Sequence, residues 1–304
     1  MDLKTFFDEV EHMLLLQILY RQVKCHQTLR LIRKWLRAPI EINGKLVKRR
    51  KGMPQGSPLS PLLSNLLLDD LDKELKRMNV KYIRYADDFS IYCQEANQAQ
   101  EVQRSVCVFL EKKLHLPINE EKSGIRRPED FTLLGYGFGK PLKGDETDEY
   151  YPKVKKKSWT NLKQKQKEAT RKTRPYSFDM RMAKLKEIQR GWIEYFKFAV
   201  MSQQLKDLDS WVRSRLRYCI WHHWKKPERR CKSLIRMGVN PIKARKWSYT
   251  RIGGWATARS PILKTTITIS RLKRRGYESM YSIYESITPY LNEPLYTRPV
   301  RTVV

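Results

Sequence analysis

Two short strand-like runs flank a pair of adjacent carboxylates in the first half of the chain. The runs, Lys81–Tyr85 and residues 89–93, are rich in aromatic and β-branched residues, and Asp87 and Asp88 stand between them. This pattern predicts a β-hairpin with two carboxylates at its tip. Adjacent carboxylates repel each other, so burying both near a third acid requires a cation such as Mg²⁺. On spacing alone, two solvated acids in a β-turn are the more common alternative.

Helix and strand patterns alternate through the rest of the first half. Apolar periodicity predicts helices over residues 10–36, about 59–78 and near 97–114, and a short strand pair near 131–138. The turn pair Asn43-Gly44 lies in a short loop after the first helix, and a Gly- and Pro-rich stretch precedes the second. Helices mixed with short strand pairs predict an α+β fold.

Positive charge is distributed unequally along the chain. The formal net charge is +30, and residues 1–139 hold 23 Lys and Arg against 18 Asp and Glu, whereas residues 140–304 hold 39 against 14. Such an excess is typical of a protein that binds a polyanion. A hydrophobic content of 40% is sufficient for a packed core. We therefore expect the second half to bind nucleic acid.

The second half follows a stretch at about 140–152 that is rich in Gly, Pro, Asp and Glu, where we place a domain boundary. Apolar residues then recur at helical spacing: Leu185, Ile188, Trp192 and Tyr195, followed by Leu205, Leu208, Val212, Leu216 and Cys219. Basic residues occupy the opposite faces: Lys184, Lys186, Arg190, Arg213, Arg215 and Arg217. The predicted organisation is a domain over 1–139, a linker over 140–152, a domain over 153–285 and an irregular tail over 286–304.

Cysteine usage and hydropathy argue against secretion and membrane insertion. The five cysteines show no paired spacing that would indicate a disulfide framework. No stretch approaches the ~18 consecutive apolar residues of a transmembrane helix, and the first residues lack the charge order of a signal peptide. Cys219, His222, His223 and Cys231 lack the spacing of a structural zinc site. We expect a cytoplasmic protein with no membrane partner.

Five blocks of the first half resemble, in order, the sequence blocks of reverse transcriptases. Tyr85-Ala86-Asp87-Asp88 resembles the YxDD box of that family. Residues 2–12 resemble the first catalytic block, and residues 52–65 resemble the block that contains the sequence PQG. Residues 116–122 and 131–138 resemble the next two blocks. Five blocks in the right order at plausible spacing are a specific signal, whereas YADD alone is a weak one.

The basic half resembles the maturase-specific, or thumb, region of group II intron reverse transcriptases. The similarity lies in residues 189–196, 208–217 and 220–227, so the resemblance covers roughly residues 1–285. It implies a right-hand polymerase palm, an antiparallel sheet with helices, followed by a basic and mainly α-helical thumb. In relatives, a segment before the first catalytic aspartate supplies the fingers, so we expect this chain to be amino-terminally truncated. Nothing in it resembles the endonuclease module of many relatives.

The resemblance implies which residues are catalytic. Asp2 and Asp87 would be the principal metal ligands, and Asp88 would be a supporting third acid. The implied cofactor is a pair of Mg²⁺ ions. Two such ions ~4 Å apart would activate a primer 3′-hydroxyl and stabilise the leaving pyrophosphate.

The same resemblance implies a set of substrate-binding residues. Phe7 matches the aromatic gate that excludes a ribose 2′-hydroxyl, with a core phenylalanine as the alternative. Gln55 and Gly56 match the loop that packs on the incoming nucleotide and template, with an ordinary helix-entry turn as the alternative. Lys122 matches a lysine near the triphosphate, with a solvated surface lysine as the alternative. Tyr85 belongs to the YxDD box.

Further residues are predicted to contact the nucleic-acid duplex. Leu134, Gly135 and Tyr136 resemble the primer grip, with a plain hairpin turn as the alternative. Basic helical faces would neutralise phosphates. The predicted RNA-binding residues are Arg190, Arg213, Arg215, Arg217, Lys225 and Lys226. Four tryptophans at helical spacing are more often core residues than stacking platforms for bases: Trp192, Trp211, Trp221 and Trp224.

The predicted function is RNA-directed DNA synthesis of the group II intron type, together with maturase function in intron splicing and mobility. The implied partners are intron and template RNA, a DNA primer or RNA–DNA duplex, and deoxynucleoside triphosphates. The alternative is a catalytically inactive remnant or splicing factor that only binds intron RNA. A retron-like or CRISPR-associated reverse transcriptase is disfavoured by the maturase-like half.

Overall fold

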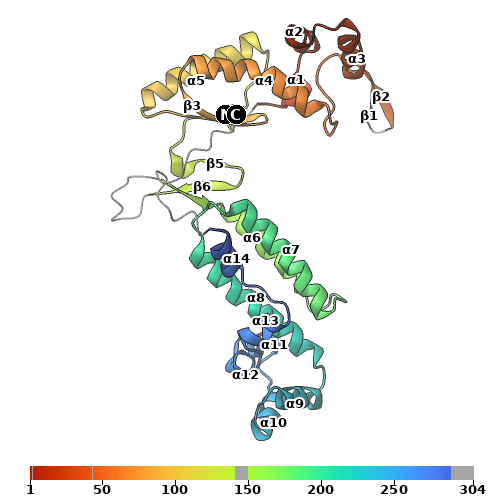
Figure 1. Ribbon diagram of the computed structural model, residues 1–304, viewed down its shortest axis with the longest axis vertical. Helices are drawn as coiled ribbons and strands as arrows, with labels where there is room; N and C mark the ends of the chain where they lie inside the picture. Colours follow the sequence, from red (N-terminus) through yellow and green to blue (C-terminus); the bar gives the residue numbers. More distant parts are fainter. Residues whose placement is uncertain (2, 43, 141–149, 289–304) are drawn as a thin grey trace. The chain divides into compact units, whose positions relative to one another are not determined.

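The computed structural model describes residues 1, 3–42, 44–140 and 150–288. The chain divides into two compact units, Met1–Arg126 and Arg127–Val304. The amino-terminal unit combines helices with two-stranded antiparallel sheets, and the carboxy-terminal unit is mainly helical with one three-stranded sheet (Figure 1). The predicted mixture of helices and antiparallel strands is confirmed. Among the described residues, every helix is too short or too polar to cross a membrane.

The predicted helices of the amino-terminal unit are present, with one interruption. The elements are α1 (Phe6–Glu9), α2 (His12–Val23), α3 (His26–Leu36), β1 (Ile40–Ile42), β2 (Lys45–Val47), α4 (Ser60–Arg77), β3 (Lys81–Tyr85), β4 (Asp88–Tyr92) and α5 (Ala96–Lys113). Helices α4 and α5 confirm the predictions at 59–78 and 97–114. The predicted helix over 10–36 is instead two helices, because Lys24 adopts a left-handed backbone, φ 44°, that ends α2.

Leucines on one face of α4 form the centre of this unit's core. Leu63, Leu67, Leu71 and Leu75 recur every four residues, and each is at most 1% exposed. They belong to one cluster with the apolar face of α5 and with Phe89 of β4. Burying each leucine contributes about 1.5–3 kcal/mol. The two helices lie along one side of the β3–β4 hairpin and anchor it (Figure 1).

The first residues pair with β4, the strand that begins at the second of the two aspartates. The Met1 nitrogen donates to the Phe89 carbonyl at 2.5 Å, and the Phe89 amide donates to the Met1 carbonyl at 3.2 Å. Leu3 forms an isolated antiparallel bridge with Ile118. Met1 and Leu3 are therefore both fixed within the amino-terminal unit.

The carboxy-terminal unit begins with a small sheet and continues as a series of helices. Its elements are η1 (Pro128–Asp130), β5 (Thr132–Leu133), β6 (Tyr136–Gly139), β7 (Tyr151–Val154), α6 (Lys156–Ala169), α7 (Phe178–Phe196), α8 (Ser202–His223), α9 (Pro227–Arg236), α10 (Pro241–Ser248), α11 (Gly254–Arg259), α12 (Pro261–Thr266), α13 (Ile269–Arg274) and α14 (Met280–Ile287). The predicted strand pair near 131–138 is confirmed as β5 and β6. The predicted irregular tail lies outside the described residues from 289 onward.

Strand β7 is not predicted by the sequence pattern. It lies at the end of the 140–152 stretch, and Pro152 within it argues against a strand. Because β7 is an edge strand of the β5-β6-β7 sheet, a proline without an amide hydrogen is tolerated there. The predicted domain boundary at 140–152 stays a prediction, and the compact units divide earlier, between Arg126 and Arg127.

The long helices α6, α7 and α8 pack together with α14 (Figure 1). The predicted apolar stripe of α8 is buried throughout, as the structure confirms: Leu205, Leu208, Val212, Leu216 and Cys219. On α7 the buried residues are Arg181, Met182, Leu185, Gln189, Ile193 and Phe196. The prediction is confirmed for Leu185, which is 2% exposed, and is wrong for Tyr195, which is 52% exposed. Ile188 and Trp192, the other two members of the predicted stripe, are half-buried and pack against the core.

Candidate functional site

The two predicted carboxylates lie at the tip of the β3–β4 hairpin. Tyr85 pairs with Asp88, so the turn between the strands consists of Ala86 and Asp87. Ala86 has a left-handed backbone with φ 55°, which costs about 1–3 kcal/mol for a residue with a side chain. Asp87 is half-buried and Asp88 is exposed. The predicted hairpin is confirmed, and its tip is a strained turn of the kind that often occurs at functional sites.

Arg84 connects this turn to α4. Its Nη1 donates to the Ala86 carbonyl and to Asn65 Oδ1, each at 3.0 Å. Its Nε and Nη2 donate to the two carboxylate oxygens of Asp72 at 2.9 and 2.5 Å. The side chains of Arg84 and Asp72 are only 13% and 18% exposed, and hydrogen bonding to Asp72 raises the pKa of Arg84. The turn is thus held by a mostly buried, bidentate ion pair, which sequence reasoning did not identify.

A cavity of about 500 Å³ opens beside the turn. Its lining combines the hairpin with α1 and α4: Phe7, Pro61, Ser64, Asn65, Arg84, Tyr85 and Ala86. The predicted gate residue Phe7 and the YxDD residue Tyr85 therefore face the same space. Phe6, the neighbouring ring at 5.3 Å, is 3% exposed and forms the core, whereas Phe7 is partly buried.

Phe7 is positioned by a segment that lies far away in the sequence. Its carbonyl accepts a hydrogen bond from the Met53 amide at 2.6 Å, and the Gly52 amide donates to the Val10 carbonyl at 2.7 Å. Gly52 has φ 84°, and a Cβ added to it would lie 2.8 Å from the Asp8 carbonyl oxygen. Only glycine combines this backbone with so close an approach. Gly52 lies in the PQG block, but its role depends on a contact that the sequence does not display.

The remaining predicted substrate residues do not line the described cavity. Gln55 and Gly56 are exposed in the loop before α4, and Gly56 has φ 81° with open space where a side chain would lie. Ser60 at the start of α4 ties this loop down, since its Oγ donates to the Pro54 carbonyl at 2.5 Å. Lys122 is exposed in a turn in which its amide donates to the Asn119 carbonyl at 3.3 Å. The roles of Gln55, Gly56 and Lys122 stay predictions.

The third predicted acid, Asp2, lies outside the described residues. Its neighbour Met1 pairs with Phe89, the residue that follows Asp88. Among the residues that the structure describes, no group of three or more His, Cys, Asp or Glu side chains is arranged to hold a metal ion. The described part of the predicted metal site therefore consists of Asp87 and Asp88.

The predicted primer-grip residues form a tight turn in the carboxy-terminal unit. Leu134 and Gly135 have φ 51° and 84°, and both lie between the paired residues Leu133 and Tyr136. Positive φ at both central positions is the pattern of a type I′ hairpin turn. The Leu134 carbonyl accepts a hydrogen bond from the Tyr195 hydroxyl at 2.9 Å. The turn is therefore anchored to α7.

The predicted RNA-binding residues differ in their surroundings. Arg217 is 5% exposed, its Nε donates to the Ile267 carbonyl at 2.9 Å, and burial lowers its pKa. Arg215 Nε donates to Thr170 Oγ1 at 2.6 Å. Both therefore have a structural contact, and their role toward RNA stays a prediction.

The other basic residues of this set are more accessible. Arg190 pairs with Glu278 at 2.9 Å on the surface, and Arg213 is half-buried. Lys225 and Lys226 are exposed between α8 and α9. These two lysines are the clearest candidates in the set for contact with a phosphate backbone.

The tryptophans serve mainly as packing residues. Trp221 and Trp224 are 3% and 9% exposed within the cluster around α8. Trp192 is half-buried, with its ring centroid 4.7 Å from that of Trp159. Trp211 is also half-buried, with the Lys163 ammonium 5.3 Å from its ring centroid. The expectation that tryptophans at helical spacing belong to the core is confirmed for Trp221 and Trp224.

Two family models match this chain. The one described as "Reverse transcriptase (RNA-dependent DNA polymerase)" matches residues 1–138, and the one described as "Group II intron, maturase-specific domain" matches residues 159–237. The first match includes the β3–β4 hairpin and the cavity beside it. The second includes α7 and α8.

Several curated proteins are similar in sequence. Group II intron-encoded protein LtrA of Lactococcus lactis subsp. cremoris is 24% identical over 270 residues, which cover 67% of this chain and 45% of that protein. Protein YkfC of Escherichia coli (strain K12) is 29% identical over 170 residues, 44% of this chain and 45% of that protein. Protein P of duck hepatitis B virus (strain Germany/DHBV-3) is 29% identical over 122 residues, 40% of this chain and 14% of that protein. The chain spans less than half the length of these relatives.

A reverse transcriptase region followed by a maturase-specific domain defines a class of intron-encoded proteins built on an RNA-directed DNA polymerase. This chain belongs to the group II intron reverse transcriptase and maturase family. The family predicted from the five blocks and the basic half is confirmed.

Proposed function

We propose that this chain is an RNA-directed DNA polymerase of the group II intron type, and that it assists intron splicing and mobility in the cytoplasm. The amino-terminal unit would be the palm, and the helices of the carboxy-terminal unit would form the thumb. The observation that carries the proposal is the cavity of about 500 Å³ that Phe7 shares with Tyr85 and Ala86. It brings the predicted sugar gate next to the turn that contains Asp87.

The acids at the turn fit a divalent metal site. Asp87 and Asp88 are adjacent hard oxygen donors whose mutual repulsion a divalent cation would relieve. Asp2, Asp87 and Asp88 would together hold two Mg²⁺ ions, which would activate the primer 3′-hydroxyl and stabilise the leaving pyrophosphate. The hydrogen bonds between Met1 and Phe89 support the inclusion of Asp2, because both partners are close in sequence to a predicted ligand.

The chain's other residues would position the substrates. Phe7 would lie against the sugar of the incoming deoxynucleoside triphosphate and exclude a 2′-hydroxyl. Arg84 would keep the Ala86 carbonyl, and with it the turn, in a fixed position. The loop containing Gln55 and Gly56 would pack on the nucleotide and template, and Lys122 would approach the triphosphate.

The carboxy-terminal unit would bind the nucleic acids. The turn of Leu134, Gly135 and Tyr136 would contact the DNA primer strand of the duplex. The basic helices would bind template and intron RNA mainly through phosphates, since the charge excess is concentrated in residues 140–304. Shape rather than base sequence would then dominate recognition.

Binding of intron RNA without polymerisation is the second candidate function. The match of residues 159–237 to the maturase-specific domain favours it, because this part of the sequence does not include the acids of the hairpin. This function requires the basic carboxy-terminal unit but not Asp87.

Primer extension on an RNA template with Mg²⁺ and deoxynucleotides distinguishes the two candidates. We expect Asp87→Asn to abolish extension while RNA affinity stays the same, and Glu101→Gln, an exposed change on α5, to affect neither. Extension by Asp87→Asn would contradict the assigned metal role. Tight, salt-sensitive RNA binding without extension by the unaltered chain would favour the splicing factor.

A further inference from the structure

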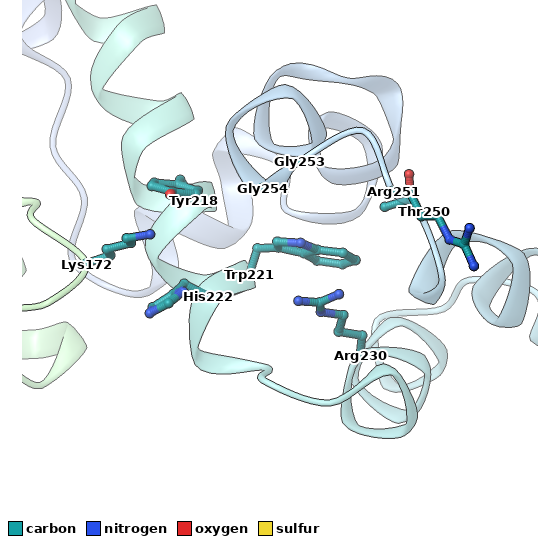
Figure 2. A pocket seen from close by; sticks show the side chains of 9 residues that line it. All are labelled: Lys172, Tyr218, Trp221, His222, Arg230, Thr250, Arg251, Gly253 and Gly254. Carbon is teal, nitrogen blue, oxygen red and sulfur yellow. The ribbon is translucent and has the colours of Figure 1, made fainter.

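The carboxy-terminal unit contains a second cavity, of about 280 Å³, where α8, α9 and the start of α11 meet (Figure 2). The side chains that line it include Lys172, Tyr218, Trp221, His222, Arg230 and Arg251. Its volume is just below the range of ~300–1,000 Å³ that is usual for small-molecule sites. The space suits one small polar ligand.

Two of the cations that line this cavity, Lys172 and Arg230, contact aromatic rings rather than carboxylates. The Arg230 guanidinium lies 4.5 Å from the Trp221 ring centroid, and its Nε donates to the Trp224 carbonyl at 2.9 Å. The Lys172 ammonium lies 5.3 Å from the Tyr218 ring centroid. Among the described residues, neither cation forms an ion pair, and no acid lines the cavity. Both charges are therefore available to an anion.

Figure 2 shows Lys172 and Arg230 on either side of His222. The His222 ring is exposed, 6.5 Å from the Tyr218 ring. Partial desolvation of the ring, followed by the nearby charges of Lys172, His223, Lys225 and Arg230, lowers the pKa of His222. These charges would favour an anion that binds beside the imidazole.

The aromatic side of the cavity is fixed in position. A Cβ added to Gly254 would lie 2.8 Å from Tyr218 Cε2, so the chain approaches this ring as closely as glycine allows. The Trp255 ring contacts Tyr218 edge-on at 5.9 Å. Gly253 has φ 83° and open space where a side chain would lie. A flat ligand would therefore lie against aromatic rings whose positions are fixed. The backbone at Gly253 leaves open space beside them.

We propose that this cavity binds a single nucleotide unit, with its phosphate between Lys172 and Arg230 and its base against the rings of His222 and Tyr218. The unit comes either from a flipped-out position in single-stranded or looped RNA or from a free nucleoside monophosphate. Proteins recognise RNA loops by stacking splayed bases on aromatic and histidine rings, which matches this combination. The RNA source rests on the RNA binding proposed above.

The test uses the full chain, the side-chain NMR signal of His222 and binding titrations. The ligands are a single-stranded hexaribonucleotide, the same oligomer with one abasic position at its centre, adenosine 5′-monophosphate and inorganic phosphate. We expect the hexamer to raise the pKa of His222, because a bound phosphate stabilises the imidazolium. A similar rise with adenosine monophosphate identifies the free nucleotide as a ligand, and a rise with the hexamer alone identifies RNA.

Variants separate this cavity from general RNA binding. Lys172→Gln with Arg230→Gln should weaken hexamer affinity about tenfold or more, whereas Lys243→Gln with Arg245→Gln, exposed on α10, removes the same charge and should weaken it much less. Lys172→Gln alone tests the site if Arg230 proves necessary for folding. A hexamer carrying 4-thiouridine should crosslink to residues 218–222.

The outcomes separate the two proposals. Equal losses in the cavity and α10 variants, or an unchanged His222 signal while the chain still binds RNA, would overturn the nucleotide site and leave RNA binding intact. Equal effects of the abasic and intact hexamers, or of inorganic phosphate, would overturn the base contact. Failure of the unaltered chain to bind any RNA would instead contradict the proposed function.

Discussion

Arg84 and Ala86 together determine the conformation of the hairpin turn. Ala86 occupies a left-handed backbone that is unfavourable for a residue with a Cβ, and Arg84 binds its carbonyl while held by Asp72. A strained residue is retained where several surrounding contacts hold its backbone in place. The ion pair therefore contributes part of the free energy that holds Asp87 in position.

Arg84→Lys tests this coupling. Lysine retains the charge but lacks the planar fork, so it cannot bind both Asp72 oxygens and the Ala86 carbonyl. We expect the free energy of unfolding to fall by about 1–3 kcal/mol and primer extension to slow at least tenfold, with RNA affinity unchanged. Chemical denaturation and extension rates measure the two effects. Arg77→Lys, in an exposed pair with Glu74, is the matched control and should change little; equal effects in both variants would contradict the proposed coupling.

Phe7→Ala tests the side chain that faces the cavity. Removing the ring opens space for a 2′-hydroxyl and should raise the use of ribonucleotides relative to deoxynucleotides by about 10–200-fold, the range in which an apolar pocket discriminates small groups. Competitive extension with both nucleotide types measures the ratio. Phe6→Ala is the contrasting variant, because its ring is buried and its loss should cost about 3–5 kcal/mol of stability. An unchanged ratio in folded Phe7→Ala would remove Phe7 from the gate.

Contiguous motifs predict some site residues and miss others. Asp87 and Tyr85 are found because the YADD box is local, and Phe7 because it stands at a set distance from Asp2. Arg84 is missed because its importance arises from its contact with Asp72 on α4 rather than from its neighbours in sequence. Gly52 is missed for the same reason, since its constraint comes from the Asp8 carbonyl.

At the scale of elements, the β5–β6 hairpin depends on α6 and α7 for its geometry. A type I′ turn favours residues that tolerate positive φ at both central positions, yet one of them is Leu134. The Tyr195 hydroxyl binds the Leu134 carbonyl, and the Lys155 amide binds the Gly135 carbonyl at 2.9 Å. The helices thereby stabilise a turn that the sequence alone disfavours.

Gly135→Ala should disrupt this arrangement. The new Cβ would meet Ser158 Oγ at 3.1 Å and the Phe196 ring at 3.2 Å, on a backbone with φ 84°. We expect a loss of about 1–3 kcal/mol in unfolding free energy and weaker binding of a primer–template duplex. Gly137→Ala in the same hairpin meets its first neighbour at 3.6 Å and serves as the control. A stability loss of the same size in Gly137→Ala would indicate general sensitivity of the sheet rather than of the turn.

The bounds of helices and strands were predictable where one apolar pattern stood without a competing pattern beside it. Helices α4 and α5 follow from their apolar periodicity, and the β3–β4 hairpin from its two short runs. On α7 the prediction failed at Tyr195, because two apolar stripes lie side by side near the end of this helix and one of them includes that residue. Packing against neighbouring helices, which the sequence does not contain, selects the stripe through Ile193 and Phe196.

At the scale of the whole molecule, the charge of +30 overstates the number of groups available to RNA. Arg181 is 1% exposed, and its guanidinium donates to the carbonyls of Ala169, Arg171 and Arg174. Arg217 is similarly committed to the Ile267 carbonyl. Part of the excess therefore stabilises the ends of helices and loops inside the carboxy-terminal unit.

Salt dependence distinguishes the two kinds of positive charge. Each phosphate contact releases about 0.7–0.9 counterions, so Lys225→Gln with Lys226→Gln should reduce the slope of log affinity against log salt by roughly 1.4–1.8 if both lysines contact RNA. Arg217→Met should leave that slope nearly unchanged and instead lower the free energy of unfolding by about 1–3 kcal/mol, because the Ile267 carbonyl loses its partner. RNA titrations from 50 to 300 mM salt, with denaturation of each variant, measure both quantities. A reduced slope in Arg217→Met at full stability would mean that its guanidinium contacts RNA despite its burial. More of the net charge would then be available to RNA than the burial of Arg217 indicates.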